Sequence, residues 1–256
     1  MFGRISSISR PRGSAVVVGP EAPTLWSSYL LGWYRSDDVT LDGSYVTRVT
    51  DKSGNDRHLG QGGGTTYCPT IETNTGGVFG NYDTWRFSGS PEHLTGSIWD
   101  LGGASNVGYT IFHVYAGRAY GSSKGIWDLS TDQTTNNYGL AGYDESSLGI
   151  VRTGAVYTLS FTQPSVDTPI VLTTNWRTGS AGTDCQVWIN GSSASGPTTL
   201  VGAGTSNPSH VRLGSLWQDV WWFDSSQAEF LIFSGTLPDS GRTAIETYLM
   251  NRYNIP

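Results

Sequence analysis

Charged residues are scarce in this sequence. They make up 14% of its 256 residues, with Asp and Glu outnumbering Lys and Arg so that the formal net charge is −6. An acidic balance favours solubility and argues against nonspecific nucleic-acid binding, which needs a basic surface. No segment approaches the roughly 20 apolar residues that a membrane span requires. No apolar run follows the first arginines, as it would in an ordinary secretory signal. We expect a soluble protein, or one exported without a signal.

Cysteine is also rare, with only Cys68 and Cys185 in the chain. They lie far apart and in no C-x-x-C motif, whereas a small scaffold that depends on disulfides carries more of them. Either they form one disulfide in an oxidising compartment or they are buried thiols. The histidines show no H-x-H or H-E-x-x-H spacing, so a zinc site is not indicated. They are His58, His93, His113 and His210.

Glycine and large aromatic residues are abundant, with 34 Gly, 10 Trp and 13 Tyr. Many short strands joined by Gly-rich turns have this composition. Runs rich in Val, Ile, Tyr, Trp, Phe and Thr predict strands. These runs are 30–34, 84–87, 109–115, 125–128, 138–143, 156–162, 169–176, 185–189, 210–216 and 228–233. Asn190-Gly191 predicts a hairpin turn, because both residues tolerate positive φ. We expect 60–66 and 191–206 to be loops.

The two ends of the chain differ from its middle. Residues 1–24 include Arg4, Arg10 and Arg12 and several prolines, and nothing acidic occurs before residue 21. This segment is either a floppy terminus or a basic arm that docks on a larger, more acidic assembly. At the other end, apolar residues at helical spacing predict an amphipathic helix over 238–253 that packs on the sheet, with Ile255 tucked in after it.

Five segments in order resemble the concanavalin A-like lectin/glucanase domain of the laminin-G-like kind. They are LGWYRSDD from Leu31, DKSGNDRH from Asp51, WRFSGS from Trp85, VWING from Val187, and AEFLIF from Ala228 with the helix after it. The resemblance covers about residues 25–256. It implies an all-β fold, an antiparallel two-sheet β-sandwich (jelly roll) with a C-terminal helix, preceded here by an arm over 1–24.

Such jelly rolls occur in secreted bacterial proteins and in bacteriophage virion proteins. The resemblance, together with the basic arm, implies a virion structural protein, a capsid decoration, fibre or tail component. Its partners would be other virion proteins, bound through residues 1–24, and further copies of itself in an oligomer or symmetric array. The alternative is a secreted or surface carbohydrate-binding module. The fold alone does not choose, because it also hosts lectins and glycanases.

Catalysis is not indicated. Glycanases of this fold carry carboxylates at alternating positions of one strand, so that acid and nucleophile project from one face. Glu229 lies on the closing strand with no second carboxylate two or four positions on. Asp219 and Asp224 are an odd number of residues apart, which would place them on opposite faces of a strand. We therefore expect a binding or structural protein and not an enzyme.

A glycan-binding role is indicated by the aromatic run near residue 220. The candidate residues are Trp217, Gln218, Asp219, Trp221 and Trp222. Indole faces stack on the C–H faces of sugars, while Gln218 and Asp219 would bind hydroxyls. Adjacent Trp221 and Trp222 cannot both face one core if the chain is extended. The outward one either binds a host-surface glycan or packs under a loop or a neighbouring subunit. Trp99, Trp127 and Tyr143 are secondary candidates for glycan contact, and core packing is the favoured explanation for each.

Aspartates cluster around the first turns and make calcium a possible cofactor. Asp37, Asp38, Asp42 and Asp51 could supply the oxygen ligands that calcium prefers. The alternative is that each carboxylate binds its own backbone, as aspartates in turns commonly do. The Asn190-Gly191-Ser192 sequon is interpreted as a turn and not as a glycosylation site.

Overall fold

The computed structural model describes residues 22–61, 64–73, 77–97, 108–120, 124–130, 136–142, 147–152, 155–176, 183–200, 209–216 and 221–256. Its early elements are η1 (Ala22–Trp26), β1 (Leu30–Asp42), β2 (Tyr45–Asp51), β3 (Leu59–Gly60), η2 (Thr65–Tyr67), β4 (Thr70–Glu72), β5 (Thr84–Ser88), β6 (Leu94–Ser97), β7 (Tyr109–Ala119) and β8 (Lys124–Ser130). The later elements are β9 (Asn136–Gly142), β10 (Ser147–Arg152), β11 (Ala155–Thr162), β12 (Ile170–Trp176), β13 (Thr183–Ile189), β14 (Ser192–Leu200), β15 (His210–Leu213), β16 (Ser215–Leu216), β17 (Trp221–Trp222), β18 (Asp224–Ser234) and the helix α1 (Asp239–Tyr253).

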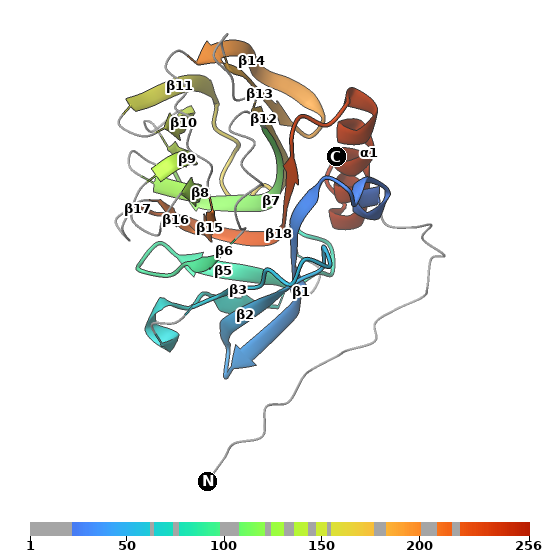
Figure 1. Ribbon diagram of the computed structural model, residues 1–256. Helices are drawn as coiled ribbons and strands as arrows, with labels where there is room; N and C mark the ends of the chain where they lie inside the picture. Colours follow the sequence, from blue (N-terminus) through green and yellow to red (C-terminus); the bar gives the residue numbers. More distant parts are fainter. Residues whose placement is uncertain are drawn as a thin grey trace.

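The all-β antiparallel class with one C-terminal helix is confirmed. Hydrogen bonds join the strands in the order β11-β10-β9-β8-β15-β6-β3-β2-β4-β5-β18-β7-β12-β13-β14, with β1 bridging β18 and β2, and only β16 and β17 form a separate pair among the described strands. The sheet curls, so that its two end strands, β11 and β14, lie against each other (Figure 1). This pairing does not show the division into two sheets that the sequence predicted.

Each predicted strand coincides with an observed one, although three details were wrong. The run 210–216 is divided at Gly214, whose φ of 86° separates β15, which pairs with β6 and β8, from β16, which pairs with β17. The segment predicted as a loop over 191–206 contains β14, which pairs with β13 beyond the Asn190-Gly191 turn. That turn has φ values of 49° and 75°, as the sequence predicted. The loop predicted over 60–66 is wrong at both ends, because Gly60 ends β3 and Thr65 begins the short helix η2.

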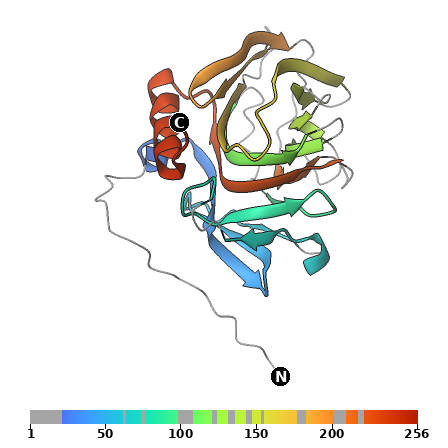
Figure 2. The ribbon, with the colours of Figure 1, turned by 180° about the vertical axis from the view of Figure 1, so that it is seen from behind.

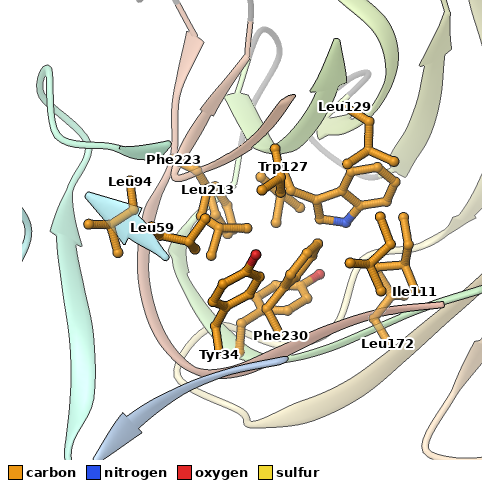
Figure 3. Close-up of a cluster of buried hydrophobic side chains, with 14 of the residues drawn as sticks. Tyr34, Leu59, Leu94, Ile111, Trp127, Leu129, Leu172, Leu213, Phe223 and Phe230 are labelled. Carbon is orange, nitrogen blue, oxygen red and sulfur yellow. The ribbon is translucent and has the colours of Figure 1, made fainter. Parts of the chain in front are cut away.

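Strands β7 and β18 pair with each other and separate two apolar layers. Along β7, Ile111 and Tyr115 face an inner cluster, while Phe112 and Val114 face an outer one. Side chains of a strand alternate between its faces, so one pair of strands can serve both layers. The inner cluster fills the curl of the sheet, and Figure 3 shows its centre, with Trp127 and Phe230 among the buried side chains.

Helix α1 covers the outer layer. Its residues Ile245, Leu249 and Tyr253 pack with Trp33 and the outer side of β7 and β18 (Figures 1 and 2). The helix ends at Asn254 in the left-handed conformation. After it, Ile255 is only 5% exposed. The sequence prediction of an amphipathic helix with Ile255 packed behind it is confirmed. None of the helices that the structure describes is long and apolar enough to cross a membrane.

The short helix η1 carries the chain from residue 22 onto α1. A Cβ atom added to Gly241 of α1 would lie 2.8 Å from the Trp26 ring, so glycine allows this close approach. Residues 22–24 of the proposed arm belong to η1. Arg4, Arg10 and Arg12 lie outside the described residues.

Candidate functional site

The two-stranded hairpin β16–β17 holds the aromatic pair that the sequence indicated. Ser215 lies opposite Trp222, and Leu216 lies opposite Trp221. The hairpin is joined to the main sheet at its base, where the Gly214 amide donates to the Ile126 carbonyl at 2.9 Å. Trp217, Gln218 and Asp219 fall between the two strands in sequence and outside the described residues. The structure therefore places two of the five predicted site residues.

The two tryptophans have different surroundings. Trp221 packs on Leu216, which is fully buried. Leu216 in turn lies so close to Gly125 of β8 that a Cβ atom there would be 2.3 Å from the Leu216 amide nitrogen. Trp222 is half-buried and packs on none of the buried apolar clusters in the described part of the chain. Trp221 therefore contributes to apolar packing in the hairpin, whereas Trp222 does not contribute to any of these clusters.

Unsatisfied polar atoms accompany Trp222. Its indole Nε1 is buried and finds no acceptor among the described residues, and the Oγ atom of Ser215, opposite it in the hairpin, also has no partner there. Buried polar atoms are normally hydrogen-bonded, and exceptions point to strain or to a function. The hairpin is therefore a functional-site candidate on grounds other than its aromatic content.

A polar surface continues from Trp222 along β18. Phe223 is buried in the inner cluster, so Trp222 and Asp224 on either side of it point the other way. We call this surface the outer polar face, and it consists of Glu72, Arg86, Arg118, Asp224 and Ser226. It occupies the outer side of β4, β5, β18 and β7, the same side of the sheet that α1 covers further along.

The outer polar face is held together by ion pairs and one hydroxyl. Arg118 Nη2 lies 2.6 Å from both carboxylate oxygens of Glu72, and Ser226 Oγ donates to Glu72 at 2.8 Å. Arg86 pairs with Asp224 at 2.7 Å. Burial opposes ionisation of Glu72, but hydrogen bonds from Ser226 and Arg118 and the charge of Arg118 outweigh it and lower its pKa. Sequence reasoning missed these residues, although Trp222, Asp224 and Ser226 follow the alternation of an extended chain.

The four candidate calcium ligands have separate contacts. Asp37 pairs with Arg35 and, at 2.9 Å, with Arg252, while Asp38 lies 3.6 Å from Lys52. Asp42 is exposed.

Asp51 accepts hydrogen bonds from the amides of Trp33, Ser53 and Arg57, each within 3.0 Å. This is the backbone role that the sequence left open as the alternative to calcium. Among the residues described, no three His, Cys, Asp or Glu side chains are grouped to hold a metal ion.

Glu229, the carboxylate of the closing strand, is fully buried between the sheet and α1. It accepts hydrogen bonds from Trp33 Nε1 at 2.6 Å and from the Tyr253 hydroxyl at 2.8 Å, and Arg252 lies 3.4 Å away. Burial raises its pKa, and the nearby arginines only partly offset this effect. A carboxylate enclosed in this way can join the helix to the sheet but cannot contact a substrate from solution.

The remaining candidates have structural surroundings. Trp127 is fully buried in the inner cluster, as predicted, whereas Trp99 and Tyr143 lie outside the described residues. Asn190 of the sequon uses its side-chain oxygen to accept from the Val171 amide at 2.9 Å, and so stabilises the turn. Cys68 and Cys185 are both buried free thiols, which settles the alternative that the sequence left open.

Comparisons with known proteins support the fold and not a family. The sequence matches no protein-family model and no curated protein. Among solved structures, botulinum neurotoxin type C, whose cell entry depends on interaction with two ganglioside molecules, is similar with a TM-score of 0.60 and 10% identity over 89% of this chain. The binding domain of paraclostridial mosquitocidal protein 1 is similar with a TM-score of 0.56 and 13% identity over 87% of this chain.

An arabinofuranosidase complexed with arabinofuranosyl-α-1,2-xylobiose is also similar, with a TM-score of 0.58 and 13% identity over 82% of this chain. The chain spans about half the length of these structures, since it covers 53%, 52% and 51% of the three. At such identities the likeness establishes an all-β fold of this general type, and the activities of these proteins do not follow from it.

Proposed function

We propose that this protein is a non-catalytic glycan-binding module whose primary contact is the indole of Trp222. The observation that carries the proposal is the contrast within the hairpin, where Trp221 packs on Leu216 while Trp222 packs on no buried cluster of the described chain. A half-buried indole on a supported hairpin presents a rigid apolar face, the surface on which a sugar ring stacks.

The structural neighbours support this proposal by analogy. They include a neurotoxin that interacts with gangliosides and an arabinofuranosidase bound to a substituted xylobiose. We further propose that the curled sheet is a jelly-roll sandwich of the concanavalin A-like kind. A non-catalytic role is favoured because Glu229, the carboxylate of the closing strand, is enclosed beneath α1 and engaged by Trp33 and Tyr253.

A glycan array followed by calorimetric titration tests the proposal. We expect binding by the wild type, its loss in Trp222→Ala, and its retention in Tyr45→Ala, which removes an exposed aromatic side chain of β2. Thermal unfolding of each variant controls for folding. Absence of binding across a broad array, or unchanged binding in Trp222→Ala, would contradict the proposed function.

We also propose that the protein acts on a virion, as a capsid decoration, fibre or tail component anchored by residues 1–24. The support is the sequence of that segment, in which Arg4, Arg10 and Arg12 occur without an acidic residue before position 21. A basic arm can dock on an acidic assembly through charge complementarity. Further copies of this chain in a symmetric array are the other expected partners. An extracellular or cell-surface location remains the alternative.

Deletion of residues 2–21 tests the anchoring role, since it leaves η1 in place on α1. We expect the truncated protein to fold, with an unchanged unfolding midpoint, and to be absent from purified particles. A matched variant with Arg4, Arg10 and Arg12 changed to Gln separates the charge of the arm from its length. Normal incorporation of the truncated protein would contradict the anchor.

A further inference from the structure

The outer polar face differs in composition from the helix-covered part of the same side of the sheet. Where α1 packs, the outward side chains of β7 and β18 are apolar, such as Phe112 and Leu231. Beyond the helix they become Arg118 and Ser226, on the same two strands. Arg118 remains 33% exposed and Glu72 36% exposed, so this half of the surface is accessible. The change from apolar to hydrogen-bonding side chains marks a boundary between a packed and an open surface.

The outer polar face begins two residues after the proposed Trp222 contact. Trp222, Asp224 and Ser226 occupy alternate positions, and Phe223 between the first two is buried on the opposite side. In an extended chain, alternate side chains project from one face at a spacing of about 6.6 Å, so four residues span about 13 Å. This length exceeds one sugar ring. A ligand stacked on Trp222 would therefore continue over Asp224 and Arg86 toward Arg118 and Glu72.

The charges of this surface restrict the ligand. Arg86 and Arg118 supply two positive charges, and each is paired with a carboxylate. Asp224, Glu72 and the exposed Asp167, which lies 4.0 Å from Arg118, supply three negative ones. The outer polar face by itself is balanced, and the neighbouring Asp167 gives this part of the surface one excess negative charge. It offers fixed donors and acceptors to hydroxyl groups but repels an anionic ligand.

We infer that the outer polar face is an extended subsite for a neutral saccharide chain of two or more units, bound from Trp222 toward the Arg118–Glu72 pair. This inference rests on the proposed function, since it takes Trp222 as the first contact. The paired guanidinium and carboxylate groups are held in fixed geometry by each other and by Ser226, and bind hydroxyls without first being ordered. The Trp222 indole supplies the apolar stacking, and the outer polar face supplies recognition of chain length and charge.

The test measures the affinity of the full chain for two series of ligands, gluco- and xylo-oligosaccharides of one to four units. Any sugar that binds on the array is added, together with its shorter fragments. Uronic-acid or sialylated counterparts provide the charged comparison. For the wild type we expect affinity to rise at least tenfold from one unit to three and to be lower for each charged counterpart. Arg118→Gln is expected to lower affinity for the longer chains about tenfold, the effect of losing one charge-assisted hydrogen bond, without changing that for the single sugar.

Two further variants separate the possible failures. Asp167→Asn removes the excess negative charge and is expected to reduce the discrimination against acidic counterparts, while asparagine tolerates the positive φ of 54° at this position. Arg48→Gln, at an exposed arginine of β2, is the matched control and should change nothing. Binding that is lost in Trp222→Ala but unaffected by Arg118→Gln and by chain length would overturn this inference and leave the proposed function standing. No binding by the wild type to any probe would overturn both.

Discussion

Trp33 of β1 and Glu229 of β18 are joined by a 2.6 Å hydrogen bond between the indole Nε1 and a carboxylate that is fully buried. The Tyr253 hydroxyl donates to the other oxygen from the end of α1. One carboxylate therefore connects the first strand, the closing strand and the terminal helix, which are far apart in sequence. A buried charge of this kind is costly when it loses a partner.

Tyr253→Phe should destabilise the protein by about 1–3 kcal/mol, because it removes one hydrogen bond to a buried charge while keeping the ring. The ring contact with Tyr82, at 5.1 Å between centroids, is expected to survive. Urea unfolding at pH 7 measures the change. Tyr45→Phe, at a tyrosine that is 39% exposed, is the control. Equal stability of the two variants would show that Glu229 does not depend on the helix.

Because His113 is buried, we expect the protein to lose stability in mild acid. It is fully buried on β7, its Nε2 lies 3.1 Å from Gln227 Oε1, and its ring stacks on Tyr115. Burial lowers the pKa of His113 to about 3, with the Gln227 hydrogen bond only a partial offset. In the unfolded chain the pKa is about 6.5, so the unfolded state alone takes up the proton between these values. The stability is complete above about pH 6.5 and falls by about 1.4 kcal/mol per pH unit below it.

The measurement is the free energy of unfolding at pH 7, 6, 5.5 and 5 for the wild type and for His113→Gln. The difference between the two curves isolates His113, because Glu229 and the other titrating groups are common to both proteins. We expect the advantage of the wild type at pH 7 to shrink steadily as the pH falls. Parallel curves would show that the His113 pKa is not depressed in the folded state.

The buried His113 helps to explain why the sequence did not predict the first residues of β18. Strand β18 begins at Asp224, but its inward positions include Ser225 and Gln227. The Gln227 side chain donates to Ser225 Oγ and hydrogen-bonds to His113 through its oxygen, inside the core. Apolar alternation therefore begins only near Ala228, where the sequence predicted the strand to start. Two residues of the outer polar face, Asp224 and Ser226, lie on the part of β18 that the sequence did not predict. It could not be assembled from sequence, because Glu72, Arg118 and Ser226 meet only through strand pairing.

Other features were predictable because local chemistry decides them. The Asn190-Gly191 turn and the helix after Pro238 depend on residues with strong conformational preferences. Strand β14 was missed because Ser, Thr, Gly and Pro in its sequence are typical of loops, while pairing with β13 overrides that preference. The sequence indicated both Trp221 and Trp222. It could not say which one packs on Leu216, because that contact depends on the register of the β16–β17 pair.

Gly125→Ala should displace the β16–β17 hairpin and weaken glycan binding. Its Cβ would lie 2.3 Å from a backbone atom of Leu216, so the hairpin must move. Overpacking of this kind costs about 1–3 kcal/mol. Gly43→Ala is the control. Gly43 has a φ of 60°, so alanine strains the backbone there, but the added Cβ would meet no atom within 4 Å. Gly43 is also far in sequence from the hairpin. Thermal unfolding and glycan titration together should show that both variants lose stability and only Gly125→Ala loses affinity.

Cys68 and Cys185 should be unreactive in the folded protein and should contribute nothing as a cross-link. Both are buried, and burial raises the pKa of each thiol, which suppresses the reactive thiolate. We expect an aromatic disulfide reagent to titrate no thiol at pH 8 in native buffer and two thiols in denaturant. Adding a reductant should leave the unfolding midpoint unchanged, whereas breaking a disulfide would lower stability by about 2–4 kcal/mol. A reductant-sensitive midpoint would show that the two cysteines pair.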